Sequence, residues 1–424
     1  MLTIKKSISK ALNITNVILV VMFLNSCGTT HKIKQNFKQI DNENSFFKGF
    51  VLYNPTTKKE LINYNGQKYF IPASNTKLFT FYTAYKTLED SITGLEYYKT
   101  QDSILIKGTA DPSLLHSFET SKVIDFLKKQ TDSIYLIDEN INDNSLGSGW
   151  AWDDYQYYYM PEKSLFPVHG NLVKYTINDR LQNSVPSYFK QNIHVLDSVS
   201  ITREFSKNIF YIQKNSKKVN NVPFITSNQL VAKLLSDEIQ KEIKLISTSK
   251  EYNFKTLKSV TSDELYKQML VESDNFIAEQ LLLQVGKKVT NSYSVKSAIN
   301  YSLINYLEGL PQVPRWVDGS GLSRYNLFSP NDFVYLLDKM YSEIPLPKLL
   351  NYLSDNNETD TLNPKIFVYA KSGSLSNNYN LSGYLITKKG TVLIFSYMNN
   401  HYQIPTSKIK NTIHKTLKLI YNNY

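Results

Sequence analysis

Three short polar segments carry the residues best suited to chemistry: Ser74–Lys77, Ser273–Asn275 and Lys371–Gly373. A serine hydroxyl is a weak nucleophile and needs a neighbouring base to take its proton before it attacks a carbonyl. Lysine can be that base when burial lowers its pKa. We therefore interpret the three segments as one centre for acyl transfer through a serine, with lysine as the general base.

Context distinguishes Ser74 and Lys77 from other Ser-x-x-Lys pairs in this lysine-rich chain. Pro72 precedes them, and apolar residues recur at helical spacing from Leu78 to Tyr85, which predicts a helix beginning near Ser74. The serine and lysine then lie one above the other on its first turn. Burial and the positive end of the helix both disfavour an ammonium, so Lys77 can accept the proton of Ser74. The alternative is a helix-capping serine with a solvated lysine.

The second segment, Ser273–Asn275, falls between two apolar helical patterns within residues 262–285. In a turn at this place, the Ser273 hydroxyl can relay a proton between Lys77 and the leaving nitrogen. The Asn275 amide can hold the substrate backbone and the neighbouring lysine. The alternative is a plain turn between helices, with the asparagine as a cap.

The third segment ends a β-rich run at residues 365–370, and two further strand patterns follow at 381–387 and 391–399. On an edge strand, Lys371 and the Ser372 hydroxyl can bind a substrate carboxylate. Gly373 leaves room for a substrate lying against the strand. The backbone N–H groups of Ser74 and Ser374 would form the oxyanion hole. A solvated lysine at a strand end is the alternative.

Further blocks occur in a fixed order along the chain, and together with the three segments they resemble one protein family. The blocks are Pro72–Leu78, Gly108–Pro112, Gly149–Asp154, Glu272–Glu279, Asp318–Arg324 and Ala370–Leu375. From about residue 45 to residue 400, the chain resembles the low-molecular-mass class C penicillin-binding proteins, serine peptidases of the D-alanyl-D-alanine carboxypeptidase/endopeptidase (DacB) type. Ser372 stands where threonine is usual and keeps the hydroxyl.

This resemblance implies an α+β penicillin-binding-protein/β-lactamase-like transpeptidase fold, an antiparallel sheet flanked by helices. It implies a D-Ala-D-Ala carboxypeptidase, and a D,D-endopeptidase as a second activity, acting on peptidoglycan stem peptides through an acyl-enzyme on Ser74. β-Lactams are expected to acylate the same serine, and neither a cofactor nor a metal is expected. Two alternatives remain: a β-lactamase or esterase on the same scaffold, and a non-catalytic lipoprotein that binds the cell wall.

Asp154 and Arg324 occupy family positions that resemble a subsite for the side chain of meso-diaminopimelate, which ends in an amine and a carboxylate. Tyr159 would supply an aromatic wall. Ser376 departs from the pattern, because a longer polar side chain there would reach further. The alternative is an ordinary surface acid and a structural arginine.

The gap between the first two segments is about twice the gap between the second and third, which predicts a domain inserted after the nucleophile helix. We expect catalytic parts at 46–96 and 226–424, with an inserted strand-rich domain at 97–225. The elements expected within them are two strands at 46–53 and 60–64, helices at 228–246 and 262–285, and an amphipathic helix at 406–421 that covers the sheet.

The N-terminus has the features of a secretory signal. Three lysines precede the apolar run Val17–Leu24, which is too short for a comfortable membrane span. The run ends in Leu24–Cys27, which resembles a lipobox, and Cys27 is the only cysteine. We predict a lipoprotein signal peptide at 1–26 and a linker at 27–45 from a lipidated Cys27, with the protein anchored to a membrane and facing the periplasm. The sequence does not indicate which membrane carries the anchor. The alternative is an ordinary signal peptide with an incidental cysteine.

Composition narrows the remaining function classes. The chain has a net charge of +11, and its lysines are spread along the sequence. This distribution suits binding to an acidic wall polymer or to phospholipid headgroups, and it does not resemble a nucleic-acid-binding module. The chain has no Gly-x-Ser-x-Gly, Gly-x-Gly-x-x-Gly or P-loop motif. Its six histidines include no His-Glu-x-x-His and are interpreted as surface or locally satisfied residues.

Overall fold

The computed structural model describes residues 46–116, 118, 121–178, 181–355 and 367–424, which fall into two compact units. The first unit takes in the chain through Asn75, together with residues 310–314 and 327–424. The second comprises residues 76–309 and 315–326. The chain therefore passes from one unit to the other inside the Ser74–Lys77 segment. The predicted signal peptide, linker and Cys27 lie outside the described residues.

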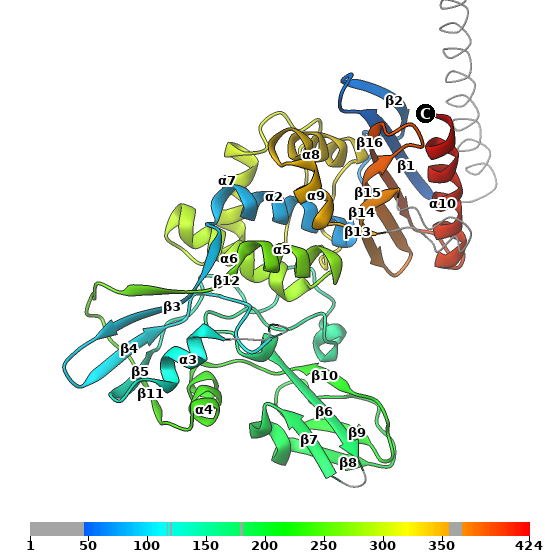
Figure 1. The fold of residues 1–424 in the computed structure, drawn as a ribbon. Coiled ribbons are helices and arrows are strands. Elements are labelled where there is room, and N and C mark those ends of the chain that lie inside the picture. Colours follow the sequence, from blue (N-terminus) through cyan, green and yellow to red (C-terminus); the bar gives the residue numbers. More distant parts are fainter. Residues whose placement is uncertain (1–45, 117, 119–120, 179–180, 356–366) are drawn as a thin grey trace, which may run out of the picture. The chain divides into compact units, whose positions relative to one another are not determined.

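The first unit is built on a six-stranded antiparallel sheet with the strand order β13-β14-β15-β16-β1-β2 (Figure 1). The strands are β1 (Phe47–Asn54), β2 (Lys59–Tyr64), β13 (Ser354–Asp355), β14 (Val368–Leu375), β15 (Asn378–Ile386) and β16 (Val392–Asn400). The α-helices of this unit are α8 (Pro330–Glu343), α9 (Leu346–Asn351) and α10 (Thr406–Asn423). The predicted antiparallel sheet with flanking helices is confirmed.

Side-chain alternation along the strands gives each face of this sheet its own helix. Leu393, Phe395 and Tyr397 of β16 join one apolar core with the buried stripe of α10, formed by Ile409, Ile413, Leu417 and Ile420. From the opposite face, the Tyr384 hydroxyl of β15 donates a hydrogen bond of 2.8 Å to the carbonyl of Leu337 in α8. The expected amphipathic helix at 406–421 is thus confirmed as a cover of the sheet.

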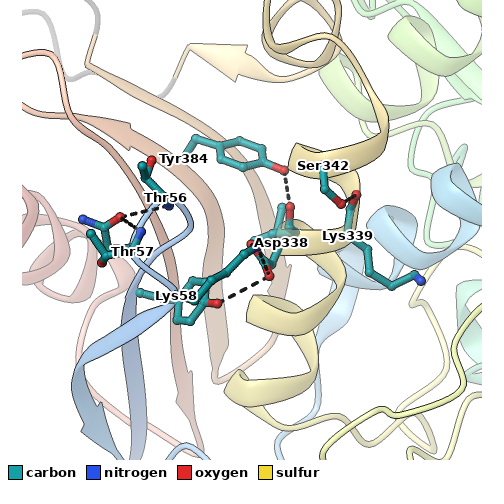
Figure 2. Close-up of polar contacts among 10 residues, drawn as sticks. Thr56, Thr57, Lys58, Asp338, Lys339, Ser342 and Tyr384 are labelled. Atoms are coloured by element: carbon teal, nitrogen blue, oxygen red, sulfur yellow. Dashed lines mark hydrogen bonds and ion pairs between the residues drawn. The ribbon is translucent and has the colours of Figure 1, made fainter.

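The turn between β1 and β2 is fixed to α8 by polar contacts (Figure 2). Lys58 Nζ donates to both carboxylate oxygens of Asp338, at 2.9 and 3.0 Å. The Asn54 side chain accepts two backbone N–H groups of the turn, each at 3.0 Å. Since the Lys58 side chain is 58% exposed, this ion pair contributes about 1 kcal/mol or less. The contact orients the hairpin more than it stabilises the unit.

The second unit combines a cluster of helices with three sheets (Figure 1). The clustered helices are α2 (Lys77–Thr87), α5 (Ser262–Val271), α6 (Asn275–Thr290) and α7 (Val295–Asn305). A mixed five-stranded sheet has the order β11-β5-β4-β3-β12, and α3 and α4 pack on it. Its elements are β3 (Ser91–Lys99), β4 (Ser103–Lys107), α3 (Lys122–Lys128), β5 (Ser133–Ile137), α4 (Asn228–Ile239), β11 (Ile243–Ile246) and β12 (Lys255–Thr261).

A separate apolar core in this unit lies under two small sheets, one of order β10-β6-β7 and one pairing β8 with β9. The strands are β6 (Leu172–Asn178), β7 (Leu181–Val185), β8 (Ile193–Leu196), β9 (Phe210–Gln213) and β10 (Asn220–Pro223). Short 3-10 turns complete the element list: η1 (Ala73–Thr76), η2 (Trp152–Gln156), η3 (His169–Asn171) and η4 (Ser187–Asn192). No helix in the described ranges has both the length and the apolar character of a membrane span.

The helix predictions at 262–285 and 406–421 hold, and the one at 228–246 needs a correction. Residues 262–285 form α5 and α6, with the Ser273 segment in the turn between them, as expected. The helix predicted over 228–246 is wrong beyond Ile239, because Gln240 takes a left-handed conformation that ends α4 and residues 243–246 form strand β11. The apolar residues there belong to a strand that pairs with β5. Over so short a segment, hydrophobic periodicity cannot distinguish a strand from the end of a helix. The predicted domain boundaries stay a prediction.

Candidate active site

The turn that carries Ser74 is held on the sheet of the first unit by two asparagines. Asn400 accepts a hydrogen bond of 2.6 Å from the backbone N–H of Ile71, and Asn380 donates one of 2.9 Å to the carbonyl of Pro72. Both asparagines are buried. Ser74 follows in η1 and is half-buried. The first turn after Pro72 is therefore a 3-10 turn, and α2 begins only at Lys77, three residues later than predicted.

The residue after the serine is anchored to the same sheet. Asn75 donates a 2.8 Å hydrogen bond to the Ser382 hydroxyl, which is 2.9 Å from the Ser396 hydroxyl on β16. Gly373 of β14 packs against this turn: a Cβ at this position would lie 2.3 Å from the Pro72 carbonyl oxygen. The glycine was expected to make room for substrate, but the space beside its Cα is filled by the turn that carries Ser74.

The third segment lies inside a strand rather than at its end. Lys371 is buried on β14, which continues to Leu375, and its Nζ donates to the Ser372 carbonyl at 2.9 Å. On the far side from β15, β14 pairs with β13 only through Tyr369 and Ala370. Within the described residues, the half of β14 that carries the segment is therefore an edge, whereas the strand as a whole is not the outermost one.

Lys77 is the first residue of α2 and is completely buried in the second unit. Its Nζ donates to Asn275 Oδ1 at 2.6 Å and to the Ser320 carbonyl at 2.7 Å. Burial lowers the pKa of Lys77 to about 8, against the opposing charges of Asp318, Asp274 and Glu279. This direction is the one expected from burial, and with such a pKa a substantial share of the amine is neutral in weakly basic solution.

The turn between α5 and α6 presents the second segment. Ser273 has a left-handed conformation (φ 59°) and is half-buried, and its hydroxyl makes no hydrogen bond within the described part of the chain. Asp274 caps α6 by accepting the Ile277 N–H at 3.0 Å, and its other oxygen lies 3.0 Å from His116 Nε2. The sequence interpretation treated His116 only as a satisfied histidine and missed that it holds this turn. The proton relay through Ser273 stays a prediction.

Asn275 connects Lys77 with two residues of the predicted subsite. Its Nδ2 donates to the Tyr159 carbonyl at 2.9 Å, and the Tyr159 hydroxyl donates to Asp154 Oδ1 at 3.0 Å. Burial, and then the Asp154 carboxylate, raise the pKa of Tyr159. Arg324 is exposed, and the hydrogen bond that Asp154 accepts comes from the tyrosine and not from the arginine. The structure thus brings Asp154, Tyr159, Asn275 and Lys77 into one chain of contacts.

A buried aspartate organises the loop that supplies the Ser320 carbonyl. The Asp318 carboxylate accepts hydrogen bonds from Gly321 N (2.9 Å), Asn326 Nδ2 (2.7 Å), Ser323 N (2.6 Å) and Trp150 Nε1 (2.9 Å). Next to it, the Gly319 carbonyl accepts from Thr80 Oγ1 at 2.6 Å, one turn beyond Lys77 on α2. The loop is fixed along α2, so the second acceptor for Lys77 is preorganised.

Each unit therefore holds a different part of the predicted chemistry. The first presents a half-buried serine on a rigid turn beside the edge of β14, where Lys371 and Ser372 lie. The second holds a buried lysine of lowered pKa between an amide and a carbonyl oxygen. The chain itself joins the two parts, because Asn75 and Thr76 are consecutive. No group of three or more histidine, cysteine, aspartate or glutamate side chains in the described ranges could hold a metal ion.

Comparisons with known proteins agree with this chemistry. The sequence model of the Peptidase_S13 family, described as the D-Ala-D-Ala carboxypeptidase 3 (S13) family, matches residues 30–420. The D-alanyl-D-alanine carboxypeptidase DacB of Haemophilus influenzae is 24% identical over 418 residues, covering 84% of this chain and 85% of the relative. The penicillin-sensitive carboxypeptidase A of Dictyostelium discoideum is 23% identical over 411 residues, covering 79% and 78%.

A solved structure gives the same fold. The crystal structure of penicillin-binding protein 4 (dacB) from Haemophilus influenzae is similar with a TM-score of 0.72 and 20% identity, covering 89% of this chain and 97% of that one. The expected penicillin-binding-protein-like α+β fold is thereby confirmed. Because the family match spans nearly the whole chain, the protein belongs to the S13 family of serine D-Ala-D-Ala carboxypeptidases, which act on the stem peptides of peptidoglycan.

Proposed function

We propose that Ser74 is the acylated nucleophile of this carboxypeptidase and that Lys77 is the base that takes its proton. The observation that carries the proposal is the setting of Lys77: completely buried, with a pKa lowered to about 8, and three residues from a half-buried serine. A base with a pKa near the working pH combines a useful neutral fraction with enough basicity to accept a proton. Asn275 and the Ser320 carbonyl hold the amine in place.

In the proposed reaction, Ser74 Oγ attacks the carbonyl of the penultimate D-Ala, and its proton passes to Lys77. The N–H groups of Ser74 and Ser374 stabilise the oxyanion. The peptide bond then breaks, and Ser273 relays the proton from Lys77 to the amine of the departing D-Ala. Water hydrolyses the resulting ester and restores Ser74. Lys371 and Ser372 bind the terminal carboxylate through hydrogen bonds that the charges of the lysine and the carboxylate strengthen.

We also propose a second activity, the cleavage of D-Ala–diaminopimelate cross-links. In this proposal Asp154 binds the side-chain amine of the diaminopimelate, Arg324 binds its carboxylate, and Tyr159 lines the subsite. The hydrogen bond from Tyr159 to Asp154, and that from Asn275 to the Tyr159 carbonyl, support it, because they tie the acid to the catalytic amide. Tyr159→Phe should weaken cleavage of cross-linked muropeptides more than release of D-Ala from a stem peptide that lacks diaminopimelate.

Penicillin should acylate Ser74, as the name of the penicillin-sensitive Dictyostelium relative suggests for a related chain. The test is incubation of residues 28–424 with a fluorescent penicillin, beside Ser74→Ala. A label that survives denaturation in the wild type and is lost in the variant would support Ser74 as the nucleophile. Rapid penicillin hydrolysis without persistent label would favour the β-lactamase alternative. Absence of both label and hydrolysis, with no D-Ala release, would favour the non-catalytic one.

For location, we propose that Cys27 is lipidated and anchors the enzyme to a membrane on its periplasmic side. The position of the only cysteine directly after Leu24–Ser26 and an apolar run supports this. Labelling of cells with a tagged fatty acid should mark the wild type and not Cys27→Ala. Equal labelling of both chains would contradict the anchor and leave the catalytic proposal untouched.

A further inference from the structure

Glu279 is a buried acid next to the base, and the reaction described above gives it no task. It lies on α6, one turn beyond Asn275, and is 1% exposed. Its Oε1 accepts the backbone N–H of Ser320 at 2.7 Å, whereas its Oε2 has no hydrogen-bond partner among the described residues. Leaving a buried carboxylate oxygen unpaired is costly, so a carboxyl in this place needs a reason beyond packing.

The contacts of Glu279 close a ring that contains Lys77. The backbone N–H of Ser320 donates to Glu279, and the backbone carbonyl of the same residue accepts from Lys77 at 2.7 Å. Asn275 accepts from the same Nζ, and Asn275 and Glu279 are i and i+4 on one face of α6. The loop has little freedom here, since a Cβ on Gly319 would lie 2.7 Å from the Ala278 carbonyl. The carboxyl of Glu279 is therefore two hydrogen bonds and one residue, Ser320, from the amine.

We propose that Glu279 is a positioning residue for the base: it holds the Ser320 carbonyl on Lys77, and its own gain or loss of a proton changes how readily Lys77 becomes neutral. A glutamine could accept the Ser320 N–H equally well, so this hydrogen bond alone does not require an acid. A carboxyl adds a charge that appears with rising pH, and an anion at this distance stabilises the ammonium of Lys77. The inference rests on the proposed role of Lys77 as base.

The charged groups around Glu279 come from several elements. They are Lys77 on α2, Asp318 in the 315–326 loop, and Lys163 with its partner Asp143 in the segments before η3. Asp274, with His116 beside it, acts on Lys77. Asp318 already accepts four hydrogen bonds, and Lys163 already pairs with Asp143 at 3.1 Å. Burial and the Asp318 charge raise the pKa of Glu279 to about 7. Within the described ranges, Glu279 forms no ion pair that would keep it charged.

The test is the pH profile of penicillin acylation between about pH 5 and 10 for the wild type, Glu279→Gln and Glu279→Leu. The glutamine keeps an oxygen for the Ser320 N–H and removes the charge, so the pKa of Lys77 should fall and the rising limb should move to lower pH. The expected shift is about one pH unit, which is the effect of one charge across this path at an effective dielectric constant of ~20. The leucine leaves the Ser320 N–H unpaired, so the rate should fall roughly ten-fold or more at every pH.

Gln284→Leu is the matched control, because Gln284 is another buried polar residue of α6, and it bonds the Thr109 carbonyl at 3.1 Å, away from Lys77. It should lose stability without a shift of the profile. A Glu279→Gln profile that superimposes on the wild type would overturn the inference. If the wild-type chain and Ser74→Ala were labelled equally by penicillin, the proposed function itself would be overturned instead.

One measurement needs no variant of Glu279. In the wild-type chain with 15N-labelled lysine side chains, the Nζ signal of Lys77, assigned with Lys77→Arg, should respond to two titrations, its own and that of Glu279. A single-step titration would overturn the inference even if both Glu279 variants failed to fold.

Discussion

Replacing Gly373 by alanine should separate the placement of the nucleophile from the stability of the fold. The added Cβ would meet three atoms of the turn that carries Ser74: the Pro72 carbonyl oxygen at 2.3 Å, Asn75 N at 2.8 Å and Asn75 Oδ1 at 2.9 Å. Ordinary contact begins near 3.4 Å, so the turn and β14 must separate by about 1 Å. The turn is itself fixed by Asn380 and Asn400, so it cannot yield freely.

Overpacking of this kind costs about 1–3 kcal/mol, and a displacement of about 1 Å at a reacting group can reduce the rate roughly 100-fold. We therefore expect Gly373→Ala to lose about two orders of magnitude in both penicillin acylation and D-Ala release, with a modest fall in melting temperature. The assay is the second-order rate constant for labelling by a fluorescent penicillin, measured beside thermal unfolding.

Gly390→Ala provides the matched control in the same unit. Gly390 has a positive φ of 86°, but a Cβ there would have no atom within 4 Å. Alanine in this conformation costs about 1–2 kcal/mol, similar to the cost expected at position 373, but it moves no residue of the site. Near wild-type acylation by Gly373→Ala would refute the reasoning, and so would equal losses of activity in the two variants.

The remaining predictions concern the second unit. Acylation should rise with pH through about 8 as Lys77 loses its proton, and Lys77→Ala should remove this limb and lower the rate about 10²- to 10⁴-fold in a stopped-flow assay. Asp318→Asn places an amide N–H₂ among four donors, so it should cost about 2–4 kcal/mol in denaturant unfolding and slow acylation. His116→Ala removes the partner of Asp274, and it should cost about 1 kcal/mol and slow acylation several-fold, whereas unchanged kinetics would show that the α6 cap suffices alone.

The sequence was sufficient to propose the residues for the chemistry, because each segment is local and the three occur together in one order. Ser74 and Lys77 are three residues apart, and the amphipathic pattern of 406–421 is complete within one helix. The burial of Lys77 and the fall of its pKa followed from the apolar helix around it. Where the pattern was short, as at 243–246, a strand and the end of a helix could not be told apart.

The groups that hold those residues could not be predicted, since each acts on a segment far away in the chain. Asn380 and Asn400 bond backbone atoms of residues 71 and 72, more than 300 positions earlier. His116 meets Asp274 across 158 positions. An asparagine in a strand or a histidine in a loop is ordinary in itself, so only the folded arrangement assigns it a role. The one signal available was the polar start of β15, where Asn378 and Asn380 precede the strand pattern predicted from residue 381.

The pKa of Lys77 shows why the direction of an effect can be read from a sequence when its size cannot. Burial alone depresses the pKa of a lysine, and Asp318, Asp274 and Glu279 together restrain that fall. Asp318 accepts four hydrogen bonds. Against the effect of burial, the hydrogen bonds to His116 and the Ile277 N–H lower the pKa of Asp274. Glu279 has one donor for two oxygens. Burial and the Asp318 charge raise the pKa of Glu279 to about 7, so its charge changes near neutrality, and in our proposal the strength of the base changes with it.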